Sequence, residues 1–410
     1  MFEIKPEFFK LSNGIQVVFL PTDAFVAHMG VMIHAGARFE SEKEEGLAHF
    51  LEHCIFKGTA KRKAFDIFTD LDSVGGELNA YTNKEEICVH ASFRNNHFTI
   101  ASELLGDIVQ NANFPEEEIQ KEKEVVLDEI ISYMDSPSER IFDDFESHIF
   151  KENSLGYNIL GTKKTVSKFT REDLLSYVDR YFTPSNMVIS FVGRTESSEL
   201  MQVLERDFGG IIRAGKEKLI TELKSFVPFK LIEKKSNFQT HTLIGGIAPS
   251  YNDPERRGMT LLTNVLGGPA LNSRLILSIR EKYGYAYNIE ANYTTYSDVG
   301  FWSVYMGTDK KYLKKALALI YDELKGICEN KLTDNELEQA KEQLKGHIAL
   351  SLDSNMELMF SLAKSVMIHG RVDSINEVYS QIDAITVHEL EVIAKKSFSI
   401  DNVAELIYKF

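Results

Sequence analysis

Two histidines and a glutamate stand close together in the stretch GLAHFLEHCIFKGT, which covers residues 46–59. Histidines four positions apart lie on the same face of a helix, so His49 and His53 can direct two ring nitrogens at one point. Glu52 lies beside that face, where a carboxylate can take a proton from water that a metal ion activates. The spacing indicates a zinc site with its own general base, and it leaves open a helix whose histidines only pack in a polar core.

Two ligands do not complete a catalytic zinc site, which normally takes three protein ligands and leaves a fourth position for water. Pro115 and the acidic residues that follow it predict a long helix over 115–135. Glu122 and Glu129 stand seven residues apart, two turns along one face of that helix. Either could be the third ligand, and the other could hold a ligand histidine through its free ring nitrogen.

Strands are expected around these helices. The segments GIQVVFLP (14–21) and HMGVMIHAG (28–36) are β-rich and bounded by turn residues, and we interpret them as paired strands. Apolar and other side chains alternate over 87–93, which is the period of a strand with two different faces. Strands and helices in this order favour an α+β fold with antiparallel pairing rather than an alternating parallel sheet.

The two halves of the chain resemble one another. A shift of 212 positions sets 46–58 against 258–270, and a shift of 218 sets 114–130 against 332–348. In the second half Leu261 and Val265 stand where the first half has His49 and His53. The comparison predicts two homologous α+β domains, 1–213 and 229–410, each a largely antiparallel sheet with helices packed on it. A linker is expected at 214–228, and the polar cluster only in the first domain.

Length and charge agree with this organisation and exclude some partners. A chain of 410 residues is longer than one hydrophobic core normally supports, and its net charge of −15 disfavours nucleic acid. The 3 cysteines form no disulfide framework, and no apolar stretch is long enough for a membrane span. The N-terminus resembles neither a signal peptide nor a transit peptide, so we expect a bacterial cytoplasmic protein.

The stretch HFLEH resembles the inverted zinc motif H-x-x-E-H of the M16 metallopeptidases, the family of pitrilysin, insulin-degrading enzyme and the mitochondrial processing peptidase. The resemblance implies that Glu129, 76 residues after His53, is the third ligand of one Zn²⁺ per chain. It implies that Glu122 is the acidic residue that supports the ligands and that Glu52 is the catalytic base. The fold implied is the LuxS/MPP-like metallohydrolase fold.

Three further segments resemble the same family: AGARFES (35–41), GGELNAYTNKEE (75–86) and NSRLILSIREKYGYAYNI (272–289). The resemblance implies a strand that receives peptide substrate at Asn79 and Ala80. It also implies that Arg280 and Tyr287, from the C-terminal domain, contact the substrate. Tyr285 stands where leucine is common in relatives, a departure that leaves every catalytic position filled and is expected to affect only the substrate pocket.

The function expected is that of a zinc-dependent endopeptidase or oligopeptidase of the M16B type acting on unfolded peptides. Family members close a chamber from four such domains and this chain supplies two, so the resemblance implies a dimer, most simply a homodimer. Two alternatives remain: a non-catalytic scaffold or subunit that needs a partner chain, and a zinc hydrolase acting on a substrate other than a peptide.

Overall fold

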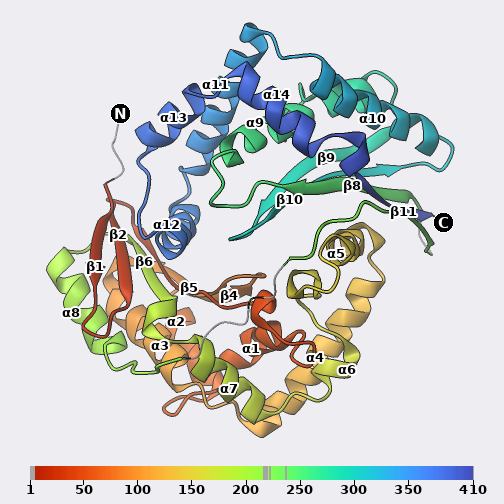
Figure 1. The fold of residues 1–410 in the computed structure, drawn as a ribbon. Helices are drawn as coiled ribbons and strands as arrows, with labels where there is room; N and C mark the ends of the chain where they lie inside the picture. Colours follow the sequence, from red (N-terminus) through yellow and green to blue (C-terminus); the bar gives the residue numbers. More distant parts are fainter. Residues whose placement is uncertain (1–4, 216–219, 221–222, 236–237, 410) are drawn as a thin grey trace. The chain divides into compact units, whose positions relative to one another are not determined.

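The computed structural model describes residues 5–215, 220, 223–235 and 238–409 (Figure 1). These residues form two compact units, each of mixed helix and sheet. Unit 1 falls within Met1–Ile131, Asn153–Glu222 and Ser351–Ile375. Unit 2 falls within Ser132–Glu152, Leu223–Leu350 and Asn376–Phe410. Each unit therefore takes one segment from the other half of the chain.

Unit 1 is built on a six-stranded sheet. Its strands, in their order across the sheet, are β1 (Glu7–Lys10), β2 (Gln16–Pro21), β6 (Met187–Gly193), β3 (Val26–Ile33), β5 (Ile87–Arg94) and β4 (Glu77–Thr82). The pair β2 and β6 is parallel, and every other neighbouring pair is antiparallel. The expected largely antiparallel sheet is confirmed.

The expected pairing of the first two strands with each other is wrong. Strand β6 lies between β2 and β3 and hydrogen-bonds to both. All of its residues are buried. The continuous apolar run of β6 is suited to an interior position that is covered on both faces. The segment between β2 and β3 reverses the chain direction but does not make the two strands neighbours.

Unit 2 repeats the topology with a five-stranded sheet. Its strands, in their order across the sheet, are β7 (Lys230–Lys234), β11 (Ala404–Lys409), β8 (Thr240–Ala248), β10 (Gly300–Thr308) and β9 (Ala286–Thr295). The first and last of these strands along the chain pair in parallel, as β2 and β6 do, and the others are antiparallel. This order matches, strand for strand, that of the five unit 1 strands other than β1. The match supports the internal repeat.

The helices of unit 1 are α1 (Leu47–Ile55), α2 (Ala64–Asp72), α3 (Phe98–Asn111), most of α4 (Glu116–Met134), α6 (Lys163–Val166), α7 (Arg171–Tyr181), α8 (Ser197–Phe208) and α12 (Asn355–His369). Those of unit 2 are α5 (Pro137–Ile149), α9 (Arg256–Gly267), α10 (Leu313–Glu329), most of α11 (Asp334–Ser351), most of α13 (Ile375–Asp383) and α14 (Val387–Ser397), with a π-helix, η5 (Ile276–Glu281). The observed α4 confirms the long helix predicted over 115–135.

Both faces of the interior strands of the unit 1 sheet are mostly buried. One face joins the large core beneath α1, α3 and α7. On the other face, Met359 and Leu362 of α12 pack in one apolar cluster with Val188 of β6. Figure 1 shows α12 beside the strands of this sheet. Cys88 of β5 belongs to the same cluster, so both sets of alternating residues in that strand are mostly covered. Segment 351–375 groups with unit 1 because its apolar helix face covers this sheet.

Unit 2 receives a helix in the same way, since α5 contacts β8 and β11 of its sheet. The two compact units thus differ from the contiguous domains 1–213 and 229–410 expected from the sequence. The reason is that an amphipathic helix belongs to the unit whose sheet it covers. Within the expected linker 214–228, residues 216–219 and 221–222 lie outside the described residues. The described linker residues form no helix or strand.

None of the described helices has the length and apolar character needed to cross a lipid bilayer.

Candidate metal centre

Helix α1 starts from a tightly fixed N-terminus. Gly46 precedes the helix in a left-handed conformation with φ of +92°, and a Cβ there would lie 2.5 Å from Cα of Gly161. Buried Glu40 accepts hydrogen bonds from the backbone N of Gly46 at 2.9 Å and of Ala48 at 2.6 Å. The first amides of a helix lack intrahelical partners, so the two hydrogen bonds that Glu40 accepts anchor the end of α1 nearest His49.

Three side chains meet where α1 faces α4. Oε2 of Glu129 lies 3.7 Å from Nε2 of His49 and 3.4 Å from Nε2 of His53. One ligand atom from each of the three residues lies within 4.8 Å of those from the other two. Among the described residues, these three side chains form the group that could hold a metal ion. A tetrahedral zinc ion with bonds of about 2.0 to 2.1 Å holds neighbouring ligand atoms about 3.3 Å apart. The three residues therefore fit a zinc ion.

Glu122 lies beside this group. Its Oε2 is 3.2 Å from Nδ1 of His53, the ring nitrogen that faces away from Glu129. Its Oε1 is 2.7 Å from Nζ of Lys57. The side chain of Glu122 is 9% exposed and that of Glu129 is 43% exposed, so Glu122 is held inside while Glu129 stays open to solvent. The structure thus brings Glu129 to both histidines and Glu122 behind one of them.

Burial favours the metal-binding form of the first histidine. It lowers the pKa of His49 to about 4, and the charge of His53 acts in the same direction. A neutral imidazole is the form that binds a metal ion. Nδ1 of His49 is buried and has no hydrogen-bond partner among the described residues, so His49 lacks the support that Glu122 gives to His53.

Glu52 lies on the same helix, partly buried beside strand β4. Burial raises the pKa of its carboxyl group, while a hydrogen bond with Thr82 and the charge of His53 act in the opposite direction. Thr82 is the last residue of β4. A carboxyl group with a raised pKa both takes and returns a proton more readily at neutral pH than an exposed one.

Strand β4 is an edge strand that runs past this helix. It pairs with β5 on one side and ends its sheet on the other. Asn79 is exposed on β4, whereas Ala80 is buried. Oδ1 of Asn79 accepts the backbone N–H of Ala80 at 2.8 Å. The edge therefore offers backbone groups to an added strand, and one of its donors is covered by a side chain.

Arg280 and Tyr287 lie together in unit 2. Arg280 belongs to η5 and Tyr287 to β9, and the guanidinium carbon lies 5.1 Å from the centroid of the tyrosine ring. The tyrosine is 82% exposed. A π-helix is rare and frequently marks a functional site. The two residues thus form a paired, accessible group.

Sequence reasoning missed two residues that the structure places around the centre. Lys57 stands four residues after His53, so the helical spacing could have indicated its approach to Glu122. Glu40 lies six residues before Gly46 and outside the helix, and no spacing rule connects it to the amides that it binds. Only the folded chain brings it there.

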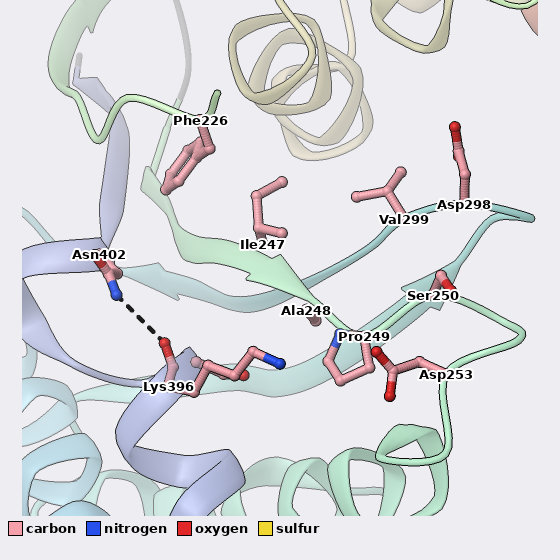
Figure 2. Close-up of a pocket in the computed structure, with 11 residues that line it drawn as sticks. Phe226, Ile247, Ala248, Pro249, Ser250, Asp253, Asp298, Val299, Lys396 and Asn402 are labelled. Atoms are coloured by element: carbon pink, nitrogen blue, oxygen red, sulfur yellow. Dashed lines mark hydrogen bonds between the residues drawn. The ribbon is translucent and has the colours of Figure 1, made fainter. Parts of the chain in front are cut away.

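A separate cavity in unit 2 is not part of this centre. It has a volume of about 420 Å³, and Figure 2 shows Phe226 and Ile247 on one side of it and Lys396 on the other. Nζ of Lys396 lies 2.7 Å from Oε2 of Glu255, and Asp253 accepts the backbone N–H of Glu255 at 2.8 Å. These charged groups thus take part in local structure at the start of α9.

Comparison with known proteins adds the family context. Residues 17–163 match the family model described as Insulinase (Peptidase family M16), and residues 168–344 match the model described as Peptidase M16 inactive domain. The first match contains the whole histidine and glutamate group. The second contains Arg280 and Tyr287.

Relatives of similar length carry protease names. The chain is 34% identical to the uncharacterized zinc protease YmxG of Bacillus subtilis over 96% of both chains. It is 33% identical to an uncharacterized zinc protease of Rickettsia felis over 95% of this chain and 94% of that protein. A solved protease structure from Helicobacter pylori superposes over both full chains with a TM-score of 0.89 and 20% identity, which shows a shared fold.

Proposed function

Because the chain belongs to the M16 peptidase family, we propose that it is a zinc-dependent endopeptidase or oligopeptidase that hydrolyses peptide bonds of unfolded peptides. The observation that carries the proposal is the approach of Glu129 Oε2 to Nε2 of both His49 and His53, at 3.7 and 3.4 Å. Two histidines and one glutamate are the composition of a catalytic zinc site, where a fourth position would be left for water.

His49, His53 and Glu129 would hold one zinc ion per chain. When bound, zinc lowers the pKa of water to about 7 and polarises a carbonyl group. Glu52 takes the proton of the attacking water and returns it to the leaving amine, which the raised pKa of its carboxyl group favours. Glu122 orients the His53 ring through Nδ1 and is itself held by Lys57.

The edge of β4 supports binding of an extended peptide. A peptide that adds there as a further strand gains main-chain hydrogen bonds and needs little sequence specificity. Asn79 and Ala80 lie on this edge, and the strand ends at Thr82, whose side chain bonds with Glu52. A peptide running along β4 would therefore reach the proposed base.

Arg280 and Tyr287 complete the proposal as substrate contacts. The phenol of Tyr287 can donate to a carbonyl or to the oxyanion that forms from it, and Arg280 can hold the ring or the peptide backbone. Their stacked arrangement and the exposure of Tyr287 support this role.

We also propose that the protein is a homodimer that encloses peptides and that it lies in the bacterial cytoplasm. Sedimentation of the active protein as a monomer at micromolar concentration would contradict the dimer.

The test is cleavage of a mixed library of quenched, unstructured peptides by the wild type and by Glu52→Gln, each with its zinc content measured. We expect equal zinc and a fall in kcat of about 10²- to 10⁴-fold in the variant. Glu124→Gln is the matched control, because Glu124 is an exposed residue of α4 and loses the same charge.

Three results would contradict the proposal. Equal cleavage by wild type and Glu52→Gln would show that Glu52 is not the base. No cleavage by either protein, with zinc bound to both, would favour a scaffold or a subunit that needs a partner. Cleavage of a non-peptide ester with no peptide cleavage would instead favour a different zinc hydrolase.

A further inference from the structure

Three tyrosines of unit 2 stack into a column. The rings of Tyr283 and Tyr285 lie 5.1 Å apart with an interplanar angle of 13°. The rings of Tyr285 and Tyr312 lie 4.9 Å apart with an angle of 23°. Tyr285 is therefore the middle ring of the column.

The backbone at the end of η5 builds this column. Gly284 adopts a φ of +62°, a conformation that other residues rarely take, and lies between two of the stacked tyrosines. Its N–H donates to the carbonyl of Arg280 at 2.9 Å, and the N–H of Tyr285 donates to the carbonyl of Ile279 at 3.1 Å. The turn that presents the column is thus hydrogen-bonded to the π-helix that carries Arg280.

Each ring of the column has a lysine near it. Nζ of Lys282 lies 5.2 Å from the centroid of Tyr283, and Nζ of Lys311 lies 4.7 Å from that of Tyr312. Nζ of Lys315 lies 5.9 Å from the centroid of the middle ring. A cation over an aromatic face is attracted to it, so the column restrains three ammonium groups that would otherwise move freely.

These ammonium groups are available to a ligand. Among the described residues, neither Lys282 nor Lys315 has a carboxylate within 4.0 Å, and Lys311 has only Asp309, at 3.7 Å. All three lysines are exposed. Segments 280–285 and 309–315 together contain six basic and two acidic residues, in a chain of net charge −15. The column is a local positive site on an acidic protein.

We propose that Tyr283, Tyr285 and Tyr312, with Lys282, Lys311 and Lys315, form a subsite for a carboxylate of the peptide substrate. The carboxylate is an Asp or Glu side chain or the C-terminus of the peptide. This inference rests on the proposed peptidase function, because the turn that forms the column also carries Arg280, our proposed substrate contact. The subsite would make the enzyme prefer acidic peptides at one position relative to the cut.

The arrangement favours a carboxylate over a single-stranded nucleic acid. A base would have to stack on an open ring face. The middle ring stacks with both of its neighbours, and each of the three rings has a lysine over it. The ammonium groups remain exposed, and an ammonium group binds a carboxylate as a compact charge with several donors.

The experiment measures binding apart from cleavage. Labelled peptides with a single Glu, moved through each position, are compared with the same peptides carrying Gln, using zinc-loaded Glu52→Gln and fluorescence anisotropy. A second pair differs only in a free or amidated C-terminus and so separates the two sources of the carboxylate. We expect one member of these sets to bind about tenfold tighter than its neutral partner, and the preference to fall as salt rises.

Matched variants test whether the column itself is responsible. Lys315→Gln should remove most of the preference, whereas Lys314→Gln should keep it, because the exposed Lys314 contacts no ring among the described residues. Tyr285→Leu removes the middle ring and leaves every charge in place, and it should also lower the preference. If Tyr285→Leu fails to fold, the two lysine variants still decide the question.

Three outcomes would overturn the inference: equal binding of all Glu and Gln peptides and of both C-terminal forms, equal loss of preference in Lys314→Gln and Lys315→Gln, or tighter binding of a single-stranded RNA oligomer that Tyr285→Leu abolishes. Failure of the peptidase proposal is seen separately, because wild-type protein would then cleave neither member of a pair whatever the anisotropy shows.

Discussion

Oε2 of Glu122 lies 3.2 Å from Nδ1 of His53, on the opposite side of the ring from the nitrogen that faces Glu129. This contact fixes which nitrogen of the ring is free for a metal ion. Lys57 continues the chain of contacts, since its ammonium group lies 2.7 Å from the other oxygen of the same carboxylate. One ligand of the proposed zinc ion is thus oriented through two further side chains.

Replacing Glu122 by Gln should weaken zinc binding without abolishing it. The variant keeps the size of the side chain but loses the charge that holds the His53 ring, and loss of such a partner costs about 10- to 100-fold in metal affinity. Competition with a chromophoric chelator measures the affinity. Glu117→Gln, an exposed change on the same helix, should leave it unchanged. Equal affinity in wild type and Glu122→Gln would contradict the supporting role.

Replacing Glu129 by Ala should remove zinc more completely than the Glu122 change does. Glu129 is the residue whose carboxylate approaches both histidines, and its side chain is 43% exposed, so its loss should disturb the packing little. We expect a zinc content near zero after dialysis and a largely unchanged circular dichroism spectrum. Full retention of zinc in this variant would assign the third ligand to another residue.

Replacing Tyr287 by Phe should lower kcat rather than raise KM. The change removes the hydroxyl group and keeps the ring that Arg280 covers, and loss of one donor to a developing oxyanion costs about 10²-fold or more. Steady-state kinetics on one quenched peptide, with zinc content checked, separates the two constants. A rise in KM alone would make Tyr287 a residue for ground-state binding only.

Glu40 should make the stability of the protein depend on pH. Burial raises the pKa of its carboxyl group from 4.5 to about 8, against the opposing effect of the Ala48 and Gly46 amides. Between these values the unfolded chain has released the proton and the folded chain retains it, so this group's contribution to stability falls as pH rises from 4.5 to about 8. The Glu40→Gln side chain stays neutral throughout.

The difference in thermal midpoint, Glu40→Gln minus wild type, should therefore increase between pH 6 and pH 9. This increase is expected whatever the difference is at pH 6. Differential scanning calorimetry of both proteins at several pH values measures this difference. Parallel curves over the whole range would show that Glu40 has the same pKa in the folded and unfolded chain.

Replacing Gly46 by Ala should destabilise unit 1. The left-handed conformation costs a residue with a side chain about 1 to 2 kcal/mol, and the new Cβ would press on the backbone of Gly161 at 2.5 Å. Urea unfolding measures the loss. Gly326→Ala is the control, because that position lies inside α10 with no atom near a new Cβ, and it should be neutral or slightly stabilising. Equal midpoints for the two variants would contradict the strain at Gly46.

The sequence alone determined the helix with His49 and His53, the long helix with Glu122 and Glu129, and two similar α+β halves. These depend on local periodicity and on internal repetition, both of which can be read along the chain. Spacing could not choose between Glu122 and Glu129, because both lie on one face of α4. The choice depends on how α4 lies against α1. This packing brings the carboxylate of Glu129 to both histidine rings and places that of Glu122 behind His53.

Only the tertiary structure showed that β6 separates β2 from β3, that Glu40 anchors α1, and that 351–375 covers the first sheet. Each of these joins residues far apart in sequence, or across a loop with no periodic pattern. Strand order and helix exchange are decided by which apolar faces bury one another, and many faces of one chain have similar apolar character. The types and spacing of the candidate catalytic residues could therefore be predicted from the sequence. Their positions relative to one another are decided only in the folded chain.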